Sequence, residues 1–158
     1  MPLTYLEGDA TRPVGHGTKI LVHVCNDVGR WGKGFVVALS RRWKAPQRAF
    51  KAAFAAGTDS ALGDVQFVPV ADDLIVANLI GQRSIAGRHT KTPPVRYDAI
   101  EAGLRTVRDR ALRDGASVHM PRIGAGLAGG DWDRIEAIIV ATLVDADVAT
   151  TVYDFAGT

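Results

Sequence analysis

Apolar residues along the chain form short continuous runs, and between these runs they recur at a spacing of three and four. The runs predict strands at residues 3–7, 19–25, 64–70, 74–81, 117–123 and 150–155. The run KILVHVC is apolar at nearly every position, which predicts a strand that is buried on both faces of a sheet. Pro69 places the third strand at an edge or in an irregular stretch, and Asp72-Asp73 predicts a hairpin turn to the fourth.

The segments between the strands predict four helices. They cover residues 35–43, a stretch from near Pro46 to Gly57, a stretch that begins at Pro93-Pro94, and residues 131–144. The apolar positions of the third helix are Tyr97, Ile100, Leu104, Val107 and Ala111. Helices that alternate with strands predict an α/β layered fold, in which ligands bind where the strand ends enter loops.

Length and composition narrow the class of protein. The 158 residues fit one domain over residues 1–158, and 47% apolar and 23% charged residues are ordinary for a soluble protein. No apolar run is long enough to span a membrane, and the first residues do not have the pattern of a signal peptide. We therefore expect a cytoplasmic protein without a membrane partner, in which Cys25 is a buried and unreactive thiol.

The charged residues and the histidines argue against two kinds of site, one for sequence-specific nucleic acid and one for a metal ion. The net charge is +2 from 19 basic and 17 acidic residues, and the basic residues do not form one long block, so we expect a small nucleotide and no sequence-specific nucleic acid as partner. His16, His23, His89 and His119 have no metal-ligand spacing. We therefore predict no metal and no cofactor, with His23 and His119 as structural residues of strands.

Two glycine-rich segments each follow a predicted strand and precede a predicted helix. They are CNDVGRWGKGF at residues 25–35 and IGAGLAGGDW at residues 123–132. Glycine permits a positive φ and lets a ligand lie on the main chain, and the free N–H groups of a helix start bind anions. Two such loops at neighbouring strand ends predict a site for a ligand with two phosphates. The alternative is that both are ordinary connections between strand and helix.

Four blocks of the sequence together resemble the macrodomain family. They are GDAT, HVCNDVGRWGKGF, ANLIGQ before a proline-led helix, and MPRIGAGLAGGDW followed by a helix and TVYDF. Their order and spacing cover nearly the whole chain and are similar to the branch with the terminal ADP-ribose protein glycohydrolase and the ADP-ribose 1''-phosphate phosphatase. The resemblance implies a three-layer α/β/α sandwich with a mixed central sheet, and ADP-ribose in a cleft above the strand ends.

The resemblance also implies which residues contact each part of ADP-ribose. Asp9 would hold the adenine amine beside Ala10 and Thr11, and Tyr153 or Phe155 would contact the adenine face unless both are core residues of the strand. Asn26 would lie near the hydroxyl groups of the distal ribose. The diphosphate and the distal ribose would contact Gly32, Lys33, Gly34 and Phe35 of the first glycine-rich loop and Ile123, Gly124, Ala125, Gly126, Leu127 and Ala128 of the second.

Two positions depart from the catalytic pattern of this branch. The glycohydrolase depends on a lysine and a loop aspartate, where this chain has Gln82 and Ala128. Because a glutamine amide cannot form the covalent intermediate, we expect water as the nucleophile. Asp131, Gln82 and Asn26 are the candidate catalytic residues, although an aspartate between glycines and a helix is also typical of an N-cap. Lys33 is more simply an ion-pairing residue beside the diphosphate.

The predicted function is binding of ADP-ribose and hydrolysis of the ester that joins it to glutamate or aspartate of a mono-ADP-ribosylated protein. Two alternatives stay open: a reader module that binds ADP-ribose without cleavage, and a phosphatase that acts on ADP-ribose 1''-phosphate. The predicted partners are ADP-ribose and mono-ADP-ribosylated proteins, and the protein is expected to be a monomer.

Overall fold

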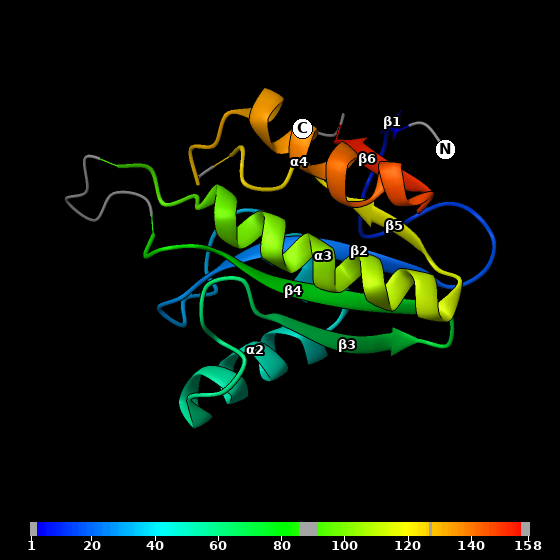
Figure 1. Ribbon diagram of the computed structural model, residues 1–158. Coiled ribbons are helices and arrows are strands. Elements are labelled where there is room, and N and C mark those ends of the chain that lie inside the picture. The colour runs from blue at the N-terminus through cyan, green and yellow to red at the C-terminus, as the bar shows by residue number, and fades with distance from the viewer. Residues whose placement is uncertain (1–2, 86–91, 127, 156–158) are drawn as a thin grey trace.

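Strands and helices alternate along the chain as the apolar pattern predicts (Figure 1). The computed structural model describes residues 3–85, 92–126 and 128–155. In these residues the elements are β1 (Leu3–Glu7), β2 (Lys19–Asn26), α1 (Phe35–Arg42), α2 (Ala45–Ala56), β3 (Val65–Ala71), β4 (Leu74–Gln82), α3 (Tyr97–Asp114), β5 (Ser117–Met120), α4 (Trp132–Thr142), a short 3-10 helix (Val144–Ala146) and β6 (Thr150–Asp154).

The strands form one mixed sheet in the order β1-β6-β5-β2-β4-β3. Neighbouring strands are parallel except for the antiparallel hairpin of β3 and β4. As predicted, β3 is an edge strand, and its register shifts between Pro69 and Ala71 because proline cannot donate to a ladder. The parallel arrangement brings the carboxyl ends of β1, β6, β5, β2 and β4 to the same edge of the sheet.

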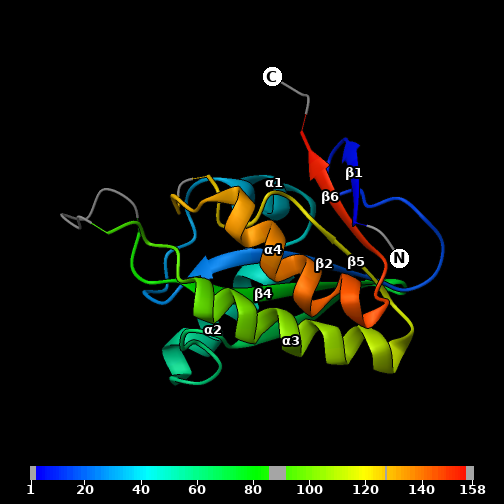
Figure 2. The ribbon, with the colours of Figure 1, turned by 45° about the horizontal axis from the view of Figure 1, so that its top comes forward.

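Helices cover both faces of this sheet, as the fold class predicts. Successive residues of β2 point to opposite faces: Ile20 and Val22 belong to a core that contains residues of α3 and α4, whereas Leu21 packs with Leu39 of α1. Phe50 of α2 adds a third cluster beside the α1 side. Figure 2 shows α3 and α4 side by side on one face of the sheet. The burial of β2 on both faces confirms the interpretation of its continuous apolar run.

The structure corrects three predicted boundaries. Helix α3 begins at Tyr97 and not at the prolines, because Pro94 accepts a hydrogen bond from Arg83 N–H and Val95 pairs with Gln82 in an extended segment beside the end of β4. Strand β5 ends at Met120 and not at residue 123, since the chain turns out of the sheet at the next residues. Helix α4 ends at Thr142 and continues as a 3-10 turn.

Two further features concern the length of the helices and the single cysteine. Within the described ranges, no helix is both long enough and apolar enough to cross a membrane. Cys25 is buried as predicted, and burial raises the pKa of its thiol because the thiolate would be desolvated. This thiol is therefore unreactive near neutral pH.

Candidate functional site

Two adjacent cavities lie at the carboxyl ends of the parallel strands. The wide cavity has a volume of about 830 Å³ and is lined by Gly8, Asp9, Ala10, Thr11, Arg12, Gly34, Phe35, Ala38, Arg41, Arg42, Trp43, Pro121, Tyr153 and Phe155. The narrow cavity has a volume of about 270 Å³ and is lined by His23, Val24, Lys33, Gly34, Phe35, Val36, Gln82, Pro121, Arg122, Ile123, Gly124, Gly126 and Ala128. Gly34, Phe35 and Pro121 line both cavities, so the two are adjacent, and we call them together the cleft.

The wide cavity gathers the residues that were predicted at the adenine end. Asp9 follows β1, and its Oδ1 accepts hydrogen bonds from the N–H of Thr11 at 2.9 Å and from the Thr11 hydroxyl at 2.7 Å. This turn fixes the carboxylate at the cavity edge. Tyr153 is 4% exposed and Phe155 is 69% exposed, so only the first of the two aromatic residues packs in the core.

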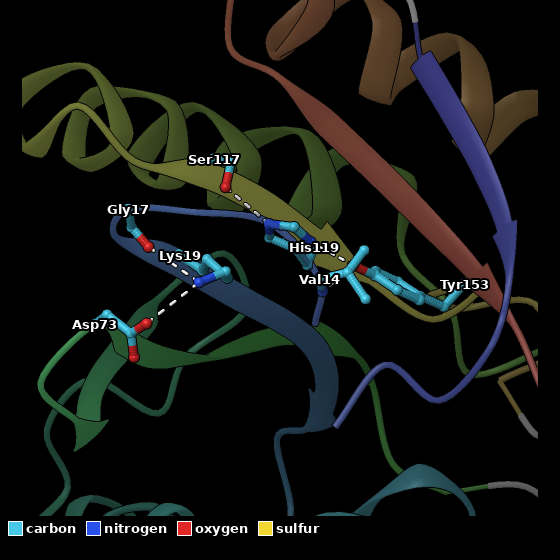
Figure 3. A network of polar contacts seen from close by, with 7 residues as sticks. All are labelled: Val14, Gly17, Lys19, Asp73, Ser117, His119 and Tyr153. Atoms are coloured by element: carbon cyan, nitrogen blue, oxygen red, sulfur yellow. Dashed lines mark hydrogen bonds and ion pairs between the residues drawn. The ribbon is translucent and has the colours of Figure 1, made fainter. Parts of the chain in front are cut away.

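A hydrogen-bond network behind the wide cavity holds Tyr153 in place (Figure 3). The Tyr153 hydroxyl accepts from the N–H of Val14 at 3.0 Å and lies 2.7 Å from Nδ1 of His119. The other ring nitrogen of His119 lies 2.7 Å from the Ser117 hydroxyl. Burial lowers the pKa of His119 to about 4, and the nearby charge of Lys19 acts in the same direction. The ring is therefore neutral near pH 7, and His119 is a structural residue as predicted.

Side chains hold the loop of residues 26–34, which we call the first loop. Asn26 accepts hydrogen bonds from the N–H groups of Val28 and Arg30, and its amide donates to the carbonyl of Arg30 at 2.8 Å. Lys51 of α2 donates to the carbonyl of Gly29. The Asn26 amide is therefore bonded within its own loop, and Asn26 does not line either cavity.

Main-chain contacts hold the loop of residues 121–130, which we call the second loop. Gly130 N–H donates to the carbonyl of Gly124 at 2.8 Å, and a Cβ at Gly130 would lie 2.5 Å from that oxygen. Gly124 and Gly129 have φ angles of 71° and 74°, a region that favours glycine. A Cβ at Gly126 would meet nothing within 4 Å. Three glycines thus close the loop on itself, whereas Gly126 leaves open space on the cavity lining.

The two cavities join beside the first turn of α1. Gly34 is the N-cap residue, with φ 81° and ψ −145°, and no side chain among the described residues caps this helix start. The amino end of α1 therefore presents uncapped N–H groups at the junction, an arrangement that attracts anions. Lys33 lines the narrow cavity, as does Arg122, whose guanidinium already forms an ion pair with Asp154. The uncapped helix start and Lys33 together make this part of the cleft favourable for a phosphate.

The narrow cavity contains one of the three candidate catalytic residues. Gln82 lies on its lining at the end of β4, and its amide donates to the carbonyl of Ser84 at 3.1 Å. Asp131 is outside both linings and caps α4: its Oδ1 accepts from Asp133 N–H at 3.0 Å. The side-chain contact of Asp131 is therefore that of a helix N-cap, the alternative to a catalytic role.

Most, but not all, of the other residues predicted to contact the ligand line the cleft. Ala10, Thr11, Ile123, Gly124, Gly126 and Ala128 lie on the cleft lining, whereas Gly32 and Ala125 do not. Leu127 lies outside the described residues. The indole of Trp31, in the first loop, donates to Ser40 and its ring packs against Phe50 and His23, so Trp31 has a packing role.

Residues that the sequence argument missed complete the cleft. Arg12, Arg41, Arg42 and Trp43 line the wide cavity, and Arg122 lines the narrow one. The sequence signal that could have identified Arg41, Arg42 and Trp43 is the motif RRW at the end of a predicted helix that follows a glycine-rich loop. His23 was predicted as structural, and it is buried, but it also forms part of the narrow cavity.

The hydrogen-bond partner of His23 defines which ring nitrogen carries the proton, and burial keeps the ring neutral. Asn78 donates through Nδ2 to Pro46 and Gln66, so its Oδ1 accepts from Nε2 of His23 at 2.5 Å. Burial lowers the pKa of His23 to about 4. In the part of the chain that the structure describes, no group of three or more His, Cys, Asp or Glu side chains is placed to hold a metal ion.

Two solved structures relate this fold to known proteins. A protein of unknown function from Bacteroides thetaiotaomicron is 48% identical, with a TM-score of 0.96 over 98% of this chain and 99% of that one. A macrodomain protein from Streptomyces coelicolor is 49% identical, with a TM-score of 0.85 over 97% of this chain and 99% of that one. The chain belongs to the macrodomain family. No protein-family model matches the sequence.

Curated relatives of this macrodomain include two glycohydrolases. The DNA ADP-ribosyl glycohydrolase of Mycobacterium tuberculosis is 29% identical over 98% of this chain and 43% of its own length. The ADP-ribose glycohydrolase OARD1 of Homo sapiens is 24% identical over 96% of this chain and 90% of its own length. The chain spans 18% of the chromodomain-helicase-DNA-binding protein 1-like of Mus musculus, to which it is 31% identical. The macrodomain is thus a small part of some relatives and nearly all of others.

Proposed function

We propose that this macrodomain binds ADP-ribose and hydrolyses the ester that links it to glutamate or aspartate of a mono-ADP-ribosylated protein. The observation that carries the proposal is the junction at Gly34, Phe35 and Pro121, where a wide cavity meets a narrow one beside an uncapped helix start. A nucleotide diphosphate joined to a second sugar has this shape, with a broad base, two phosphates and a smaller ribose. The names of two curated relatives support glycohydrolase chemistry.

Each part of the ligand has matching chemistry in the cleft. The Asp9 carboxylate accepts hydrogen bonds and suits the exocyclic amine of adenine, while Tyr153 or Phe155 of the cavity lining offers aromatic surface to the base. Lys33 and the amino end of α1 favour the two phosphates. The distal ribose would then occupy the narrow cavity, with its anomeric carbon near Gln82.

In the proposed reaction, water attacks the anomeric carbon of the distal ribose. A bond forms between the water oxygen and that carbon, the bond from the carbon to the ester oxygen breaks, and the proton of the water goes to the departing carboxylate. A carboxylate is a good leaving group, so positioning of the water accounts for much of the required rate. We assign this positioning to the Gln82 amide. Asn26 and Asp131 would contribute indirectly, Asn26 by its hydrogen bonds within the first loop and Asp131 by capping the helix that follows the second loop.

The decisive experiment measures ADP-ribose release from a protein that carries the modification on glutamate, in parallel with serine-linked and arginine-linked proteins. We expect release from the glutamate-linked protein alone. Gln82→Ala should lower turnover by more than about tenfold and leave ADP-ribose affinity within a factor of about two, because it removes a group that acts in the transition state. Gln47→Ala, on α2 and outside both cavity linings, is the matched control.

Asp131 is tested separately because its removal would also remove a helix cap. Asp131→Asn keeps the capping oxygen and removes the charge. Unchanged turnover in this variant would limit Asp131 to its structural role, whereas a fall of about tenfold would assign it to catalysis.

The two alternative functions give different results in the same assay. Calorimetric binding of ADP-ribose without release from any linked protein would make this macrodomain a reader. Release of inorganic phosphate from ADP-ribose 1''-phosphate, without cleavage of the ester, would make it a phosphatase. Absence of ADP-ribose binding would contradict all three.

A further inference from the structure

One segment of this chain carries several basic residues and no acidic ones. Residues 28–58, which comprise most of the first loop, α1 and α2, contain seven of the 19 basic residues and none of the 17 acidic ones. They are Arg30, Lys33, Arg41, Arg42, Lys44, Arg48 and Lys51, and all seven are exposed. We call them the basic face. The net charge of +2 hides this asymmetry, because the remainder of the chain carries an excess of acidic residues.

The pairing of charges separates this face from the opposite one. On α3, each of the four arginines forms an ion pair with an acidic side chain, as in Arg105 with Glu101 and Arg110 with Asp114. Among the described residues, no basic side chain of residues 28–58 forms an ion pair with an acidic one. The positive potential of the basic face is therefore not neutralised locally and acts on an approaching polyanion.

The basic face is continuous with the cleft. Arg41 lines the wide cavity and also a shallow groove of about 260 Å³ across α1 and the start of α2, which Lys44 lines as well. At the other end Lys33 lines the narrow cavity, and Lys51 bonds to Gly29 of the first loop. A strand that follows the basic face would therefore pass beside the mouth of the cleft.

The side chains of this face suit nucleic acid better than an acidic peptide. Four of the seven are arginines, whose planar guanidinium groups both bind phosphates and stack on bases. The guanidinium of Arg42 already lies 5.0 Å from the ring centroid of Trp43, and Trp43 and the exposed Phe155 line the wide cavity. Basic residues beside aromatic rings are typical of surfaces that bind single strands without sequence preference. An acidic peptide would use the charges but not the aromatic rings.

We infer that the basic face binds a single-stranded nucleic acid, without sequence specificity, beside the cleft. This inference deepens the proposed function, since it would bring ADP-ribosylated substrates that are part of, or bound to, a nucleic acid to the cleft. The binding itself requires no ADP-ribose, and the two proposals can therefore be tested apart.

The experiment measures fluorescence anisotropy of a labelled single-stranded oligonucleotide of about 16 nucleotides as a function of salt. If about four phosphates are neutralised, the logarithm of the binding constant falls with a slope of about −3 against the logarithm of salt concentration, or roughly 50-fold between about 50 and about 200 mM. Tryptophan fluorescence should be quenched on binding because a base stacks on Trp43, and Trp43→Leu should remove most of the quenching.

The test variant is the double substitution Lys44→Glu and Arg48→Glu. Neither residue lines the wide or the narrow cavity, and both lie at the amino end of α2, where acidic residues favour the helix dipole. We expect oligonucleotide affinity to fall by more than about tenfold and the salt slope to become shallower by about 1.4. The control, Arg105→Glu with Arg108→Glu on α3, makes the same change in net charge on the other face and should retain the wild-type affinity.

Three results would overturn the inference. They are no oligonucleotide binding at about 50 mM salt, equal loss of binding in the test and control variants, or tighter binding of polyglutamate than of the oligonucleotide at equal charge. The last result would assign the face to an acidic protein segment. Calorimetry with free ADP-ribose separates this test from the proposed function. If the protein binds the oligonucleotide but not ADP-ribose, only the proposed function of the cleft is contradicted. If it binds ADP-ribose but not the oligonucleotide, only the inference about the basic face is contradicted.

Discussion

The two glycine-rich loops of this macrodomain each connect a strand to a helix, but different groups of the chain hold them in place. In the first loop, side chains carry the structure: Asn26 bonds to two N–H groups and a carbonyl, and Lys51 reaches in from α2. In the second loop the backbone carries it, through the close contact of Gly130 with Gly124. A glycine-rich loop therefore indicates either a surface for a ligand or a chain that must approach itself, and the neighbours of each glycine distinguish the two.

Acid should destabilise the protein through the histidine beneath the first loop, and this is the largest effect that we expect. The ring of His23 packs against Trp31 and Phe35, and the folded protein keeps it neutral with a pKa of about 4. The unfolded chain binds a proton at its ordinary pKa of about 6.5, so it binds more protons than the folded state between these values. The contribution of His23 to stability is complete above about pH 6.5 and should fall by about 3 kcal/mol as pH decreases to about 4.

Urea unfolding at several pH values measures this loss. His23→Gln preserves a donor for Asn78 and removes the titrating ring, so the variant should lose less stability on acidification than the wild type. The pH dependence that remains would come in part from His119, whose pKa is also lowered to about 4. If the variant and the wild type had identical pH dependence of stability, protonation of His23 would not account for the loss in acid.

A pair of glycine substitutions tests the second loop. Gly130→Ala places a Cβ 2.5 Å from the Gly124 carbonyl oxygen, so the loop must shift, and we expect a loss of about 2 kcal/mol in the free energy of unfolding. Gly126→Ala meets nothing within 4 Å and should change stability by less than about 0.5 kcal/mol. Because Gly126 lies on the cavity lining, its substitution should still weaken ADP-ribose binding in calorimetry. Equal stability of the two variants would contradict the assignment of Gly130 to loop closure.

The smallest effect should come from the side-chain support of the first loop. Asn26→Ala removes the bonds to Val28 N–H, Arg30 N–H and the Arg30 carbonyl, and these groups can partly regain water. We expect a loss of about 1 kcal/mol in urea unfolding, with Asn26→Asp retaining more stability because it keeps the acceptor. If Asn26→Ala instead left stability unchanged and reduced ADP-ribose affinity, Asn26 would contact the distal ribose directly.

The sequence predicted the fold class and most elements because their signals are local. The apolar run of β2, the Pro69 irregularity of β3 and the Asp131 cap of α4 each depend on residues within one segment. The start of α3 was wrong because it depends on partners from elsewhere in the chain: Arg83 and Gly81 hold Pro94 and Arg96 in an extended path. A helix boundary that distant hydrogen bonds define cannot be found from local propensity alone.

The sequence by itself determined the alternation of strands and helices, the two glycine-rich loops, and the residues Asp9, Lys33 and Gln82 that line the cleft. Only the tertiary structure decided that Arg41, Arg42 and Trp43 join Tyr153 around one cavity, and that Asn26 and Asp131 turn to their own loop and helix instead. The physical reason is that propensity and periodicity act between neighbours in the chain, whereas a cavity depends on which strand ends meet at one edge of the sheet. That meeting follows from the strand order, which no single segment contains.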